Sequence, residues 1–242
     1  MKNVPAAHIL LLLGVAAVFA WSGWQPYDRF TWWLEIFPGL VALVILAATY
    51  RRFRLTTFCY TLIAFHICIL CVGGHYTYAR VPLFDWLRSV FGWHRNHFDR
   101  LGHFAQGLVP AIIARELFVR LRILNRPRWM PFLILCVCLA ISAFYELIEW
   151  WTALLSGSAA TAFLATQGDV WDTQEDMMLA LIGASCALIF FRRWHDRQLK
   201  KLEALDPRRG RFQPLRAVAL RAEAERLTGR RVGPSGPKAN RL

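Results

Sequence analysis

Charged residues are scarce over most of this 242-residue chain, which argues against an ordinary soluble domain. Asp, Glu, Lys and Arg make up 19% of the residues, whereas hydrophobic residues make up 56%. Soluble domains carry about 25% charged residues. Acidic residues are the scarcer kind, with 16 Asp and Glu against 29 Lys and Arg. The composition therefore indicates a protein whose solvent is mainly lipid.

Two families of motif are also missing. The sequence holds no recognisable nucleic-acid-binding motif, so we expect no nucleic-acid partner despite the basic balance. It has six cysteines but no C-x-x-C-H haem-attachment motif, and its one C-x-x-C pair, Cys68 and Cys71, has no second pair beside it. We interpret the cysteines as small apolar side chains that pack inside the protein.

Long apolar runs are present instead, and each can cross a bilayer. Crossing about 30 Å of hydrocarbon takes about 20 apolar residues, and only helices or closed barrels satisfy their backbone in lipid. The sequence predicts an all-α polytopic bundle with six transmembrane helices, at about residues 5–21, 31–50, 55–75, 97–119, 129–155 and 172–191. A signal peptide is the alternative for the first run, because Val18-Phe19-Ala20 resembles a cleavage site.

Arginine placement predicts the orientation. Basic residues concentrate in cytoplasmic loops, and here they follow the second, fourth and sixth runs, as Arg51, Arg52 and Arg54, then Arg120, Arg122, Arg126 and Arg128, then Arg192 and Arg193. We therefore expect a multi-pass protein of the bacterial inner membrane with both termini in the cytoplasm. The segments 22–30, 76–96 and 156–171 then face the periplasm.

The chain divides into a transmembrane domain, residues 1–191, and a basic tail, residues 192–242. The tail carries 15 Lys and Arg against five Asp and Glu, and its end is rich in Pro, Gly and charge. Such an end is typical of disorder. A basic segment beside the membrane attracts anionic lipid. We expect a cytoplasmic tail that contacts anionic lipid.

Ionisable residues inside the runs are the candidates for function, since charges in lipid are costly and mark sites. Spacings of three or four place them on single helix faces. The predicted topology brings these faces to the periplasmic ends of neighbouring helices, and His75 closes a further helix there. The candidate metal ligands are His75, His97, Asp99, His103, Glu146, Glu149, Asp172 and Asp176, and the candidate catalytic residues among them are Asp99, His103, Glu149 and Asp172.

Three readings of this cluster stay open. Imidazole and carboxylate groups on bundle helices suit a divalent metal such as zinc, manganese or iron, which could act on an envelope lipid or a cell-wall component. Chains of acids and histidines also serve ion- or proton-coupled transporters. The third reading is a structural or regulatory membrane protein in which Arg95, Arg100 and Arg115 pair with these acids. Arg115, Glu116 and His195, at the other membrane face, are interpreted as interfacial.

Four stretches resemble a known family. GGHYTYA, RNHFDRLGHFAQG, ISAFYELIEWW and QGDVWDTQEDM, in this order, are similar to the YjdF family of bacterial inner-membrane proteins over residues 8–199. The resemblance implies a polytopic inner-membrane protein and no established activity. A more distant similarity to VanZ-like proteins, associated with glycopeptide resistance, rests on Asp99, His103, Glu146 or Glu149, Asp172, Asp176 and Gly183. A homo-oligomer would supply the second half that a transporter needs.

Overall fold

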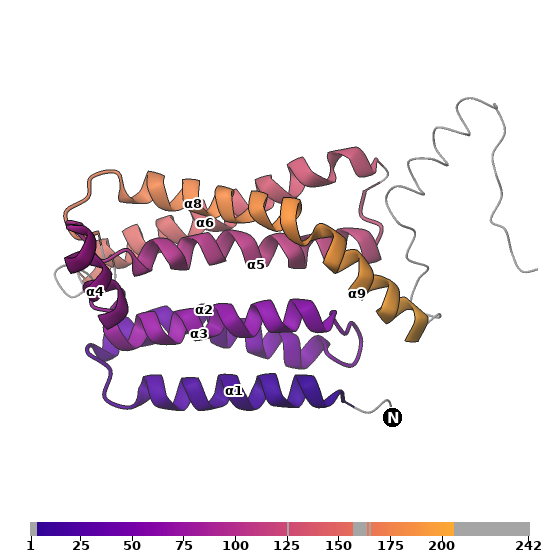
Figure 1. Cartoon of the computed structure of the whole chain (residues 1–242), viewed down its shortest axis with the longest axis horizontal. Coiled ribbons are helices and arrows are strands. Elements are labelled where there is room, and N and C mark those ends of the chain that lie inside the picture. Colours follow the sequence, from indigo (N-terminus) through magenta and orange to yellow (C-terminus); the bar gives the residue numbers. More distant parts are fainter. Residues whose placement is uncertain (1–3, 125, 157–163, 165, 206–242) are drawn as a thin grey trace, which may run out of the picture.

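All regular structure among the described residues of the computed structural model is helical, as expected from the sequence. The structure describes residues 4–124, 126–156, 164 and 166–205. The longer helices lie nearly parallel, and Figure 1 shows them stacked side by side. Their bounds are α1 Ala6–Gly23, α2 Arg29–Thr49, α3 Thr57–Tyr76, α4 Pro82–Phe91, α5 Phe98–Arg120, α6 Met130–Ser156, α8 Asp172–Cys186 and α9 Arg192–Leu205.

Five helical stretches of the described residues are long and apolar enough to cross a membrane. They are Ala6–Gly23, Arg29–Thr49, Thr57–Tyr76, Pro127–Leu155 and Asp172–Ala204. The helix α5 is equally long but carries more polar side chains, and it lies in the bundle against α3, α6 and α8. A helix surrounded by others can hold polar groups that a lipid-facing helix cannot.

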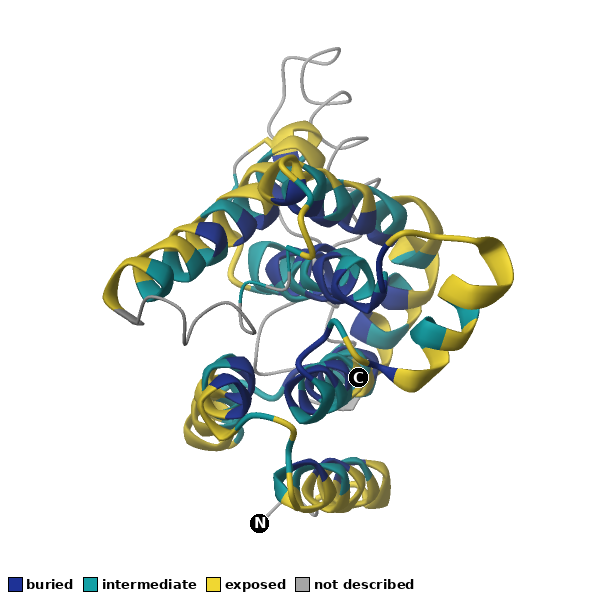
Figure 2. Cartoon of the chain, turned by 90° about the vertical axis from the view of Figure 1, so that its left-hand side faces the viewer, coloured by how far each residue is buried: buried dark blue, intermediate teal, exposed yellow. Residues whose placement is uncertain are grey.

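The bundle has two ends, which we name by their short helices. The α4 end holds α4, the start of α5 and the start of α8, whereas the α9 end holds α9 and the start of α1 (Figure 1). Viewed onto the α4 end, the buried residues face the middle of the bundle and exposed residues line its outer sides (Figure 2). The exposed side chains include many large apolar ones, such as Leu12, Phe37 and Val44, which fits a protein whose outer sides meet lipid.

The helices α5 and α8 approach each other unusually closely, because glycines lie at their contact. A Cβ atom at Gly107 would lie 1.7 Å from the carbonyl oxygen of Ala180, and one at Gly183 would lie 2.0 Å from that of Phe104. Small residues allow such close helix contacts in membranes. Gly107 lies one turn after His103 on α5, and Gly183 lies two turns after Asp176 on α8. The glycine contact therefore sets the distance between the two helices near these polar residues.

Two helical segments were not expected from the sequence. The amphipathic helix α4 occupies part of the segment 76–96, which we expected to be a periplasmic loop. The last membrane helix continues without a break, through a π-helical stretch Ala187–Phe191, into α9. The tail beyond residue 205 lies outside the described residues.

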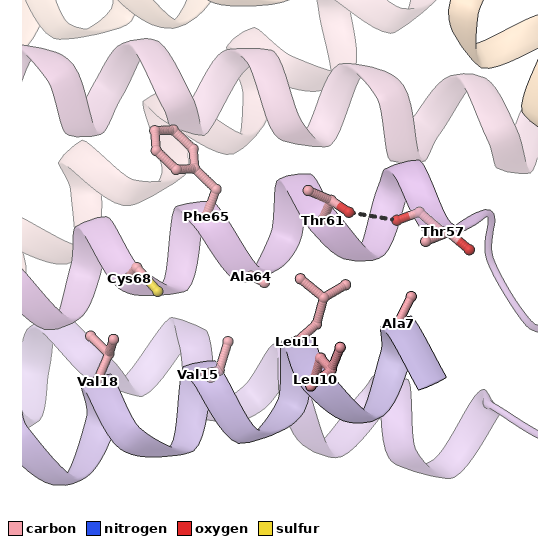
Figure 3. A pocket seen from close by; sticks show the side chains of 11 residues that line it. Ala7, Leu10, Leu11, Val15, Val18, Thr57, Thr61, Ala64, Phe65 and Cys68 are labelled. Atoms are coloured by element: carbon pink, nitrogen blue, oxygen red, sulfur yellow. Dashed lines mark hydrogen bonds between the residues drawn. The ribbon is translucent and has the colours of Figure 1, made fainter. Parts of the chain in front are cut away.

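The first helix packs against α3 along an apolar groove (Figure 3). Leu10, Leu11 and Ala64 line it, and its hydroxyl groups belong to Thr57 and Thr61. Thr61 donates its hydroxyl to the carbonyl oxygen of Thr57, 3.0 Å away, so this group is already satisfied by its own helix. The groove therefore offers packing surface without polar chemistry.

Candidate functional site

The α4 end contains a buried cluster of acids around one histidine. His103 and Asp99 lie one turn apart on α5, Glu146 and Glu149 come from α6, and Asp176 comes from α8. All are buried except Glu149, which is partly exposed. The sequence-predicted faces of three helices thus converge on His103.

The two nitrogens of His103 face different acids. Its Nε2 atom lies 3.6 Å from Oδ1 of Asp99 and 3.7 Å from Oδ2 of Asp176. Its Nδ1 atom lies 3.8 Å from Oε1 of Glu146. Each of these distances exceeds the 2.7–3.2 Å range of a normal N–H···O hydrogen bond. The acids surround the ring without closing hydrogen bonds to it.

Several polar atoms in this cluster are buried and lack a partner among the described residues. They are Nδ1 of His103, Oε1 of Glu146, Oδ1 of Asp176 and Oε1 of Gln106. A buried polar atom without a hydrogen bond costs free energy, so native proteins rarely leave one. Three of these atoms belong to His103, Glu146 and Asp176, and both acids lie within 4 Å of the imidazole ring of His103.

A buried glutamate that the sequence analysis passed over joins the cluster from α2. Glu35 is buried and accepts a hydrogen bond from the Tyr145 hydroxyl at 3.4 Å. The signal was available, because Glu35 is an acid inside an apolar run. The same rule that selected Glu146 would have selected it.

Arginines and aspartates form the outer layer of the site. Arg95, in the loop before α5, pairs with Asp172 and lies 3.5 Å from Asp99 and 3.3 Å from Asp169. Burial alone would lower the pKa of Arg95, but its bond to Asp172 and the surrounding acids raise it. Arg100 pairs with Asp169 and with Glu175. Asp172, a candidate ligand, is thus held by an arginine.

Two of the predicted metal ligands lie outside the cluster. The ring of His75 stacks on Trp21 at 4.6 Å, and its Nδ1 atom lies 3.0 Å from the carbonyl oxygen of Ser22. His97 packs edge-on against Trp93 at 4.8 Å. Burial, followed by the charges of Arg100 and Arg95, lowers the pKa of His97. These two histidines share the α4 end with the site but point elsewhere.

A second polar network lies at the α9 end, where we had interpreted its residues as interfacial. That interpretation is wrong: Glu116 and His195 are completely buried. Glu116 accepts from the Thr56 hydroxyl at 2.7 Å, from Cys59 Sγ at 3.0 Å and from Arg120 at 2.6 Å. The network joins the start of α3 and the end of α5 to α9.

The protonation of His195 follows from its neighbours. Arg115 can only donate, so Nδ1 of His195 accepts a hydrogen bond from its Nη1 atom at 2.9 Å. The Nε2 atom then carries the ring hydrogen and donates to Glu116, 3.1 Å away. Cys59, Glu116 and His195 lie close enough to hold an ion, but this arrangement turns a proton toward the carboxylate where a metal would need a lone pair. The network is a structural clasp.

Comparison with known proteins identifies the family. Residues 7–197 match the family model described as "Predicted membrane protein (DUF2238)". The chain belongs to the DUF2238 family. It is also 49% identical over 189 residues to "Inner membrane protein YjdF" of Escherichia coli (strain K12), covering 78% of this chain and 90% of that protein. The resemblance to the YjdF family is therefore confirmed. No solved structure matches this DUF2238 protein.

Proposed function

We propose that this protein binds a divalent metal ion at Asp99, His103 and Asp176 and uses it on an envelope lipid or a cell-wall component. One observation carries the proposal. Nε2 of His103 lies 3.6 and 3.7 Å from an oxygen of each aspartate, too far for a good hydrogen bond and near enough to share an ion. Tetrahedral ligands about 2.1 Å from a metal are themselves about 3.4 Å apart.

The charge balance supports a cation. Six buried or partly buried carboxyl groups gather around His103, and the one arginine among the described residues that reaches them, Arg95, pairs with Asp172 and lies 3.5 Å from Asp99. Arg100 pairs with Asp169 and Glu175, outside the centre. Burying several carboxylates without compensation is very costly, so cations or protons must accompany them. The six are Glu35, Asp99, Glu146, Glu149, Asp172 and Asp176.

Glu146 has a natural role beside such an ion. A histidine that binds a metal through one nitrogen usually donates the other N–H to a carboxylate, which fixes the ring. Nδ1 of His103 faces Oε1 of Glu146, and both atoms lack a hydrogen-bond partner within the described structure. We infer that metal binding at Nε2 fixes the proton on Nδ1, which then bonds to Glu146.

We further propose that Glu149 acts on the bound substrate. It lies one turn after Glu146, belongs to the same ligand group with His103, and is the more accessible of the two. A metal lowers the pKa of a bound water and polarises a carbonyl or phosphoryl oxygen. A carboxylate beside it can take or return the proton. We assign Glu149 as the proton-transfer residue of a metal-assisted reaction.

We also propose six transmembrane helices, with the α4 end in the periplasm and the α9 end in the cytoplasm of the inner membrane. Arginines gather at the α9 end, after α2 and after α5 and in α9, as the positive-inside rule requires of a cytoplasmic side. The relative from Escherichia coli is named an inner membrane protein. Arg192, Arg193, Arg197, Lys200 and Lys201 on α9 would contact anionic lipid there.

Elemental analysis of untagged protein in mild detergent tests the proposal. After incubation with zinc, manganese or iron and dialysis, we expect about one metal ion per chain. His103→Ala should abolish binding. His75→Ala is the matched control, because it removes a histidine from the same end but outside the cluster. Wild-type protein that retains none of these metals would overturn the metal site.

Transport is a second candidate, because Glu35 and Tyr145 extend the polar cluster toward α2. Metal or proton flux in proteoliposomes distinguishes the two functions. Flux that depends on His103 would favour transport over the metal-assisted reaction. Stoichiometric metal binding without flux would favour the metal-assisted reaction.

A further inference from the structure

The short helix α4 exposes a large apolar face. Leu83, Trp86 and Phe91 are each about 60% exposed, and Val90 is 55% exposed. Their spacing of three, seven and eight residues places them on one side of the helix, whereas Asp85, Arg88 and Ser89 occupy the other side. Soluble surfaces rarely expose apolar side chains in such a continuous stripe.

The position of α4 is fixed relative to the spanning helices. It follows α3 after five residues and precedes α5 by six. Phe84 packs edge-on against Phe98, the first residue of α5, at 5.4 Å. The Asn96 amide donates to the carbonyl oxygen of Val81 at 3.0 Å and to Asp85 at 3.1 Å. These contacts hold α4 beside the end of α3 and the start of α5.

The apolar face of α4 is continuous with the surface of the spanning region. Phe91 stacks on Trp93 at 5.0 Å, and Trp93 packs against His97 at 4.8 Å. His97 is the residue directly before α5. A chain of ring contacts therefore connects the stripe on α4 to the end of a helix in the bundle. Tryptophan is the residue most typical of the membrane–water interface.

We propose that α4 lies in the outer leaflet of the membrane, with Leu83, Trp86, Val90 and Phe91 buried among lipid acyl chains. A helix with a strong polar face opposite an aromatic one binds in the plane of the interface. The ion pair of Arg88 and Asp85, 3.4 Å long, lies on the face that would meet water. Lipid is favoured over a protein partner because the stripe begins at the membrane boundary and runs along it. This inference is independent of the metal site and rests on the proposed orientation, in which the α4 end faces the periplasm.

Cysteine labelling of the full chain in lipid vesicles tests the proposal. Ser89→Cys places a thiol on the polar side of α4 and Val90→Cys places one in the apolar stripe, about 100° away around the helix axis. Wild type gives the background of the native cysteines. With a charged, membrane-impermeant maleimide added outside right-side-out vesicles, we expect Ser89→Cys to react at least about tenfold faster. Equal rates would show that Val90 faces water and would overturn the proposal.

Dilution with lipid separates bilayer from protein partners. We expect protection of Val90→Cys to remain constant when the lipid-to-protein ratio of the vesicles rises about a hundredfold, because insertion in the bilayer does not depend on protein concentration. Protection that disappears on dilution would assign the stripe to a second copy of the chain and overturn the lipid assignment.

Discussion

Nε2 of His103 on α5 lies 3.7 Å from Oδ2 of Asp176 on α8, beside a close backbone contact between these two helices. Neither residue would be near the other without Gly107 and Gly183, whose missing side chains let the two backbones touch. The histidine and the aspartate are therefore neighbours because of glycines one turn or two below them. Function at this site depends on packing that no ligand would contact.

Substitution of either glycine should open the site. Gly107→Ala would place a Cβ atom 1.7 Å from a backbone oxygen of α8, and a backbone cannot move aside cheaply. Overpacking costs about 1–3 kcal/mol and occasionally more, and we expect a lower melting temperature in detergent together with loss of bound metal. Gly14→Ala on α1 is the control, since nothing lies within 4 Å of its Cβ position. Equal melting temperatures for the two variants would contradict the close-contact explanation.

Asp176 and Glu146 should differ in how their loss affects metal binding. Asp176→Asn removes a direct ligand, so we expect no stoichiometric metal. Glu146→Gln removes only the group that fixes Nδ1 of His103, and loss of such a partner weakens metal affinity about 10–100-fold. Metal titration followed by equilibrium dialysis measures both. If the two variants bind equally tightly, the assigned roles are wrong.

Acid should weaken the outer layer of the site through Asp169. The Trp171 backbone N–H, with help from Arg95 and Arg100, lowers the pKa of Asp169 below its usual 3.8. A depressed folded-state pKa stabilises the protein above the unfolded value, and this contribution disappears as the pH falls through the lower folded value. Asp169→Asn should therefore melt at a lower temperature than wild type at pH 7.

The difference between these two proteins should start to shrink at about pH 4, where the carboxyl group of the unfolded state takes up a proton, and should vanish only below the lower pKa of the folded state. Thermal unfolding of both proteins in detergent from pH 7 to pH 3 measures it. A difference that persists unchanged at pH 3 would show that Asp169 acts through its shape and not its charge.

The clasp at the α9 end should matter for stability and not for metal. Glu116→Ala leaves Arg120, His195 and the Thr56 hydroxyl without their shared acceptor. Removing one partner of a buried charge pair costs about 3–5 kcal/mol, so we expect a large drop in melting temperature and faster proteolysis within α9. Asp196 is one-third exposed, and Asp196→Asn keeps an amide oxygen as acceptor for the buried Arg115, so this variant should cost less. Folded Glu116→Ala protein that lost its metal would contradict the separation of the two networks.

The end of the bundle at which the site lies could be predicted from the sequence, but the set of side chains that meet there could not. Hydropathy and arginine placement assign His103, Glu146 and Asp176 to one end of three helices, and the structure brings them together. They do not give the rotation of each helix about its axis. His75 lies at the predicted end, yet its ring faces Trp21 on α1.

Continuity of helices was also hidden from sequence reasoning. His195 follows Arg192 and Arg193, so the sequence alone suggests a residue at the membrane–water interface. Because α8 passes into α9 without a break, α9 packs His195 against α3 and α5, where it is fully buried. The same packing of α9 covers Glu116. A hydropathy plot ends the last apolar segment at the arginines, whereas the helix continues past them into α9.

The helix α5 contributes to both polar networks, through His103 at one end and Arg115 at the other. At 1.5 Å per residue these positions are about 18 Å apart, whereas the hydrocarbon layer is about 30 Å thick. The stretch of α5 between the two networks is thus shorter than the hydrocarbon layer is thick. Under the proposed orientation, α5 therefore carries buried polar side chains within the membrane at both of its ends.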